Sequence, residues 1–130
     1  MQHTFARGAE AYRQTMVQSR SPLELVVMLY DGALRFLRET EDAMRRGDLI
    51  AKRDALSKSF AILSELQSTL NVDQGGQTAE SLDSLYTYMI NRLTEANVQK
   101  DPVPVQEVIT LLSGLRDAWA AVAQAPPPAA

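Results

Sequence analysis

The chain has 130 residues with 13 basic and 16 acidic side chains, a formal net charge of −3 and no cysteine. This length predicts a single domain with its own core, and the acidic balance argues against nucleic-acid binding. Without cysteine there is no disulfide and no thiolate site, which leaves the compartment open with a lean to the cytosol, and no apolar run is long enough to insert into a membrane.

Residues 1–18 carry one turn-spaced apolar strip, formed by Phe5, Ala9, Tyr12 and Met16. The segment is too short to be a stable helix alone. We therefore expect a mobile covering segment, attached loosely, that lies on an apolar surface elsewhere in the chain.

Four helices are predicted between residues 19 and 124. Ser21 and Pro22 begin the first and Gly47 ends it; the second covers 49–70, the third runs from 78 or 81 to 98, and the fourth covers 103–123. The turn residues of 71–77 separate the second helix from the third. Short connections favour antiparallel neighbours, so the expected fold is all-α, an up-down four-helix bundle, followed by a disordered proline-rich tail over 125–130.

The first predicted helix is apolar over an arc of roughly 200°, about twice the width that one packed face needs. Its inward stripe is formed by Val26, Tyr30, Ala33, Leu37 and Met44. Beside that stripe, Gly32 predicts a depression. Two interpretations stay open: the arc contacts two neighbouring helices, with Gly32 allowing close packing, or it forms a groove for an amphipathic partner helix.

The groove interpretation predicts a set of partner-binding residues on three helices. The second helix adds a further apolar strip that includes Ala51 and Ala55, and one tyrosine projects from the third helix off its inward face. The predicted partner-binding residues are Leu25, Met28, Gly32, Phe36, Ile62, Leu66 and Tyr88. Phe5, Tyr12 and Met16 would cover this surface when no partner is bound.

The residues that catalysis needs are missing from the predicted bundle. The only histidine is His3, so the paired Glu-x-x-His motifs of a carboxylate-bridged metal site cannot form. Gly75 and Gly76 follow no strand and precede no Gly-Lys-Ser, so they indicate a turn rather than a phosphate loop. We expect no enzyme activity, no metal and no cofactor.

Several motifs in order along the chain resemble the flagellar secretion chaperones of the FliS family. They are Tyr12, SPLELVVMLYDGAL at 21–34, the glycine pair at 75–76, LDSLYTYM at 82–89, LTEAN at 93–97 and LRDAW at 115–119. Two departures, Ser19-Arg20 and Gln77-Thr78, affect the start of the first helix and of the third.

The resemblance implies a cytoplasmic chaperone that binds the disordered C-terminal segment of flagellin, prevents premature polymerisation and aids flagellar type III export. It also implies that the N-terminal segment can cover the apolar grooves. An export-gate component or a co-chaperone is a further expected partner, and the chain is expected to be a monomer or a weak homodimer. The alternative is a structural helical scaffold that self-associates and has no client.

Overall fold

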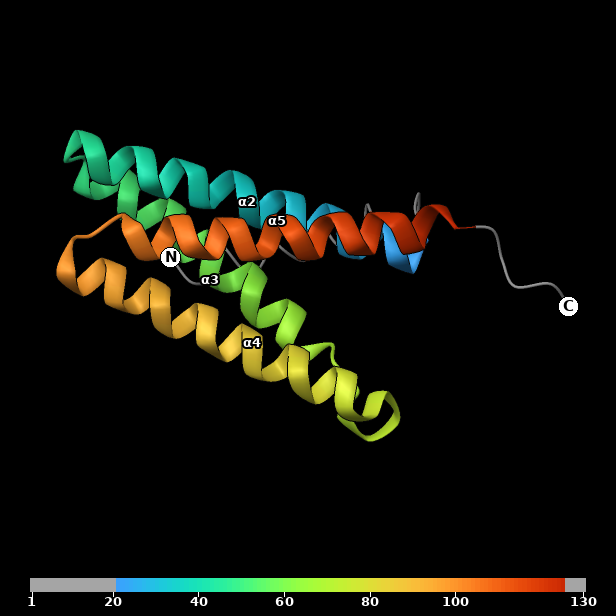
Figure 1. Ribbon diagram of the computed structural model, residues 1–130. Coiled ribbons are helices and arrows are strands. Elements are labelled where there is room, and N and C mark those ends of the chain that lie inside the picture. Colours follow the sequence, from blue (N-terminus) through green and yellow to red (C-terminus); the bar gives the residue numbers. More distant parts are fainter. Residues whose placement is uncertain (1–20, 126–130) are drawn as a thin grey trace, which may run out of the picture.

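The computed structural model describes residues 21–125, apart from the side chain of residue 72, and folds them into four helices (Figure 1). These helices are α2 (Pro22–Arg46), α3 (Leu49–Ser68), α4 (Val72–Gln99) and α5 (Val103–Gln124). The all-α prediction is confirmed. The predicted covering segment and residues 126–130 of the predicted tail lie outside the described residues.

The predicted ends of α2 are confirmed by its capping geometry. The Ser21 side chain accepts a hydrogen bond from the Glu24 backbone N–H at 3.2 Å. Gly47 has a φ of 72°, and its backbone N–H donates hydrogen bonds to the carbonyl oxygens of Ala43 and Met44 in the last turn of α2. Asp48 then caps α3, accepting the Ala51 backbone N–H at 3.0 Å. Hydrogen bonds between residues close in sequence therefore determine where α2 ends and where α3 begins.

The start of α4 differs from the prediction, because residues 72–75 are helical rather than part of a loop. Asn71 caps this short piece through its side chain, which accepts the Gln74 N–H at 3.1 Å. Gly76, with φ 57° and ψ −137°, interrupts the helix, so only Asn71 and Gly76 of the predicted 71–77 break have non-helical backbone angles. The second helix also ends at Ser68, slightly before the predicted position.

The helices pack in chain order around a common core. α2 packs most extensively against α3 and next against α5, α4 packs against α5, and α3 meets α4 least; the backbones of the diagonal pairs do not come close to each other. Figure 1 shows α3 beginning beside α2 and approaching α4 only toward the α3–α4 turn. The result is an antiparallel up-down bundle that is loosest between α3 and α4.

The core is built from the inward faces of the four helices, including the predicted stripe of α2. Its most deeply buried apolar side chains are Tyr30, Ala33 and Leu37 of α2, Leu63 of α3, Met89 and Leu93 of α4, and Val105, Val108 and Leu112 of α5. Two apolar residues, Leu49 of α3 and Val122 of α5, are exposed. Both lie in terminal turns, where the neighbouring helix no longer covers the inward face.

Candidate partner-binding surface

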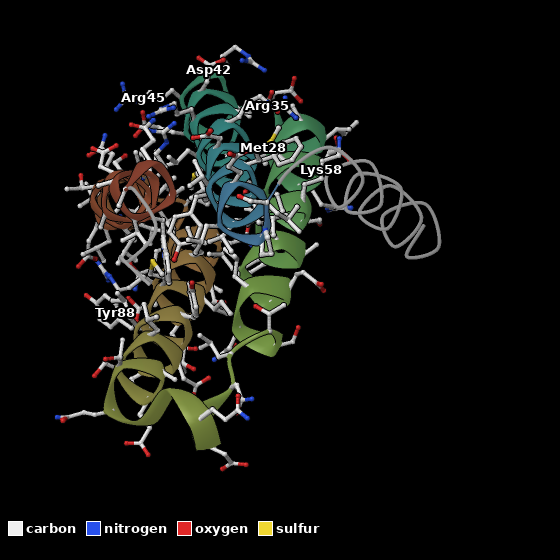
Figure 2. All side chains as sticks on the ribbon, turned by 90° about the vertical axis from the view of Figure 1, so that its right-hand side faces the viewer. Met28, Arg35, Asp42, Arg45, Lys58 and Tyr88 are labelled. Carbon is white, nitrogen blue, oxygen red and sulfur yellow. The ribbon has the colours of Figure 1, made fainter. Side chains whose placement is uncertain are left out.

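Five of the predicted partner-binding residues meet where α2 packs on α3, and we call this surface the α2–α3 seam. It comprises Leu25, Met28, Gly32 and Phe36 of α2 and Ile62 of α3. All five are partly exposed. In Figure 2, Met28 lies near Arg35 and Lys58 at this seam. The seam is therefore a continuous surface with apolar side chains that the bundle covers only in part.

Gly32 does not form an open depression in this structure. A Cβ atom added to Gly32 would lie 3.3 Å from Cδ1 of Ile62, so the space above the glycine is occupied by α3. Gly32 thus allows α2 and α3 to approach closely. Of the two interpretations of this glycine, the structure shows the close-packing one.

The apolar arc of α2 is wide mainly because α2 lies between two helices. Leu29 on one flank and Leu34 on the other are both buried, since α2 packs against α3 and α5. Leu66, which was predicted to bind a partner, is 3% exposed and belongs to the core. The surface left for a partner is therefore narrower than the arc suggests.

Two cations flank the half-buried ring of Phe36. The guanidinium carbon of Arg35 lies 4.8 Å from the ring centroid and the Lys58 ammonium lies 5.3 Å from it. Lys58 also pairs with Asp54 at 3.1 Å. This arrangement was not predicted, because Lys58 comes from α3 and only the packing of α3 on α2 brings it to Phe36. The seam combines an aromatic side chain with positive charge.

Toward the α2–α3 turn the seam becomes polar. A shallow hollow there is lined by Glu39, Asp42, Arg46, Ala51, Asp54 and Ala55. Arg46 forms an ion pair with Asp42 within it. The apolar part of the seam therefore ends near Phe36 and extends from there toward the start of α2.

Tyr88 lies on a different surface, between α4 and α5, far from Met28 in Figure 2. Its side chain is 44% exposed, and its hydroxyl donates to Glu107 at 2.6 Å. Arg92 also donates to Glu107 at 2.6 Å. Hydrogen bonding to Tyr88, and next to Arg92, lowers the pKa of the Glu107 carboxyl, and the same bond to Glu107 raises the pKa of Tyr88. Tyr88 is thus held in a surface network and not at the seam.

A polar cluster inside the core joins three helices and was not predicted. The hydroxyls of Tyr30 and Tyr86 are 2.5 Å apart, and the indole N–H of Trp119 donates to the Tyr30 hydroxyl at 3.2 Å. Burial raises the pKa of both tyrosines. Tyr30 lies on the predicted inward stripe of α2, and a buried tyrosine needs a hydrogen-bond partner, which is the signal that could have revealed the cluster.

The described residues were also searched for metal-binding groups and for helices that could span a membrane. Between residues 21 and 125, no group of three or more histidine, aspartate or glutamate side chains could hold a metal ion. Over that same range, none of the helices has the length and apolar character needed to cross a bilayer.

Comparison with known proteins identifies the family. The family model described as "Flagellar protein FliS" matches residues 5–126. The chain is 40% identical over 119 residues to the "Flagellar secretion chaperone FliS" of Salmonella typhimurium, covering 88% of each chain. It is 37% identical over 109 residues to the protein of the same name in Bacillus subtilis, covering 84% of this chain and 80% of that one. The chain therefore belongs to the FliS family of flagellar secretion chaperones.

Proposed function

We propose that this chain is a cytoplasmic export chaperone that binds the disordered C-terminal segment of flagellin, prevents its premature polymerisation and aids flagellar type III export. The observation that carries the proposal is membership of the FliS family over residues 5–126. The partly exposed apolar side chains of the α2–α3 seam support it. The proposed action is binding alone, with no catalytic step and no cofactor.

The α2–α3 seam has the chemistry that an amphipathic segment needs. Leu25, Phe36 and Ile62 are partly exposed, so a helix laid along the seam would bury apolar surface on both sides. Burial of this area offsets the entropy lost when a disordered segment becomes ordered. Arg35 and Lys58, which flank Phe36, would pair with acidic side chains of the segment.

The N-terminal segment and the further partners belong to the same proposal. Phe5, Tyr12 and Met16 would lie on the seam while no flagellin is bound and would leave it when flagellin arrives. Their apolar strip has the turn spacing that such a role requires. An export-gate component or a co-chaperone would meet the loaded chaperone, which we propose to be a monomer or a weak homodimer.

Calorimetry of the full chain with a peptide of the flagellin C-terminal segment tests the proposal. Leu25→Ala combined with Phe36→Ala removes apolar surface from the seam and should weaken binding about tenfold or more. Val122→Ser, which changes an exposed side chain of α5 outside the α2–α3 seam, is the matched control and should leave affinity unchanged.

Tyr88→Ala shows whether the segment also reaches the surface between α4 and α5, as the partner-binding role predicted for Tyr88 requires. The absence of any saturable complex would contradict the proposal. If the chain then self-associated through the same seam, the scaffold alternative would account for the surface instead.

A further inference from the structure

The hairpin formed by the end of α3 and the start of α4 has less packing support than the rest of the bundle. α3 packs against α4 less than any other pair of neighbouring helices does. In both views the α3–α4 turn stands apart from α2 and α5 (Figure 1 and Figure 2). Between positions 67 and 78 none of the described side chains is buried. A segment with so few buried contacts opens at a low cost in free energy.

The chain on either side of this hairpin is anchored in the core. Leu63 and Leu66 of α3 are buried there, as are Tyr86 and Met89 of α4. Tyr86 is also hydrogen-bonded to Tyr30 at 2.5 Å. We call residues 68–85, which lie between these anchors, the flap. A weakly packed segment between two anchored stretches is able to open while the rest of the bundle stays folded.

The flap carries apolar side chains on both of its arms. Leu70, Leu82 and Leu85 are partly buried and pack against the core. Because α2 and α3 run antiparallel, the flap lies at the end of the bundle where α2 begins, which is also the apolar end of the α2–α3 seam. Opening of the flap would therefore uncover apolar surface at that end of the seam.

Gln67 links the two arms of the hairpin at the edge of the flap. Its side-chain amide nitrogen donates to the Thr87 hydroxyl at 2.8 Å, to the Asp83 carboxylate at 3.0 Å and to the Asp83 backbone carbonyl at 3.2 Å. The two hydrogens of this nitrogen are thus shared among three acceptors on α4. Gln67 and Asp83 are partly buried, so water competes less for these bonds. They hold α4 to α3 where the two helices pack little against each other.

We propose that the flap opens locally on the folded bundle, that Gln67 is the latch that keeps it closed, and that opening enlarges the apolar surface next to the α2–α3 seam. The closed flap covers its three leucines and the core beneath them, which limits self-association while no client is bound. The open flap offers this surface to a client segment. The use of the flap in binding rests on the proposed function, whereas the opening itself does not.

Amide hydrogen exchange of the full chain, followed by NMR in the absence of flagellin, tests the opening. It is measured where reclosing is faster than exchange. The hydrogen-bonded amides of residues 68–85 should have protection factors about tenfold or more below those of Leu37, Leu93 and Leu112. Their exchange should also change little with urea below the unfolding transition, because local opening exposes little surface. Protection equal to that of the core would overturn the proposal.

Two variants distinguish local opening from global unfolding. Gln67→Ala breaks the latch and should lower the protection factors of the flap about fivefold or more. Val105→Ala removes fully buried apolar volume near the α4–α5 turn, at the opposite end of α4. It should lower the protection of core amides and leave the flap unchanged, because the packing of Val105 survives opening of the flap.

Either of two results from these variants would overturn the proposal. A flap that lost protection in Val105→Ala as the core does would belong to the same cooperative unit as the core. A flap unaffected by Gln67→Ala would show that Gln67 is not the latch.

Calorimetry with the flagellin C-terminal peptide tests the use of the flap. Gln67→Ala should bind the peptide more tightly, at most by the factor by which it lowers flap protection, because less free energy is then needed for opening. Val105→Ala should bind with unchanged affinity. Equal or weaker binding by Gln67→Ala would overturn the role of the flap in binding. Failure of the unmodified chain to bind would instead contradict the proposed function, and hydrogen exchange would still decide whether the flap opens.

Discussion

Replacement of Tyr30 by phenylalanine tests whether the polar cluster of the core stabilises the bundle. The Tyr30 hydroxyl is bonded to Tyr86 at 2.5 Å and accepts the Trp119 N–H at 3.2 Å. Tyr30→Phe removes both bonds and leaves the Tyr86 hydroxyl without a partner at a position that is 2% exposed. An orphaned buried hydroxyl costs about 1–3 kcal/mol. The half-buried Trp119 can turn to water, so we expect a total loss of about 2 kcal/mol.

Replacement of the second tyrosine, Tyr86, should cost less stability than replacement of Tyr30, and the two losses should not add. Tyr86→Phe leaves the Tyr30 hydroxyl bonded to Trp119 and should cost only about 1 kcal/mol. The double variant leaves no orphaned hydroxyl, so it should lose about 1–2 kcal/mol less than the sum of the single losses. Tyr30→Phe should therefore lower the free energy of unfolding more than Tyr86→Phe does, and the double variant should lower it by less than the sum of the two.

Urea unfolding followed by circular dichroism measures these free energies directly. For a chain of this length a loss of 1 kcal/mol lowers the melting temperature by about 3–5 °C, so the differences are measurable. The chain has a single tryptophan, Trp119, whose emission should change in Tyr30→Phe and not in Tyr86→Phe. Equal costs for the two single variants, with strict additivity in the double variant, would refute the assigned cluster.

Three further predictions concern glycines and pH. Gly76→Ala should destabilise the chain by about 1–3 kcal/mol in urea unfolding, because only glycine adopts its backbone angles easily; Gly114→Ala, with nothing within 4 Å of the added carbon, should instead stabilise it by about 1 kcal/mol. Equal effects would contradict this difference. Gly32→Leu should cost about 1–3 kcal/mol by forcing α2 from α3, and adding Ile62→Ala should recover part of that loss; no recovery would place the clash elsewhere. Burial raises the pKa of Tyr86 above the ordinary value of 10.0, so only the unfolded chain ionises near that pH. Stability should hold below about pH 10 and fall above it, less steeply in Tyr86→Phe; equal slopes would count against this cause.

Local sequence signals were sufficient for the helices and most of their ends. Ser21, Gly47 and Asp48 each act through residues within a few positions, so the predicted starts and stops match the structure. The start of α4 was misjudged because Asn71 can cap a single helical turn before Gly76 interrupts it. The turn-forming residues of this segment predict a loop, whereas the hydrogen bond of the Asn71 side chain supports a short helix.

Contacts between residues that are far apart in the sequence could not be predicted from the spacing of apolar residues. The position of Ile62 over Gly32 depends on the register of α3 against α2, and the pairing of Tyr30 with Tyr86 joins residues 56 positions apart. An apolar arc also cannot show which of its flanks a neighbouring helix covers. For that reason Leu66 was placed at the surface although it belongs to the core.

The central claim is that the α2–α3 seam shelters a terminal segment of flagellin, and binding of that segment to the intact chain tests it most directly. The account predicts a saturable complex in calorimetry, with affinity reduced about tenfold or more by Leu25→Ala with Phe36→Ala and unchanged by Val122→Ser. A complex of equal affinity in all three proteins would contradict the seam as the binding surface. No complex in any of them would contradict the chaperone role.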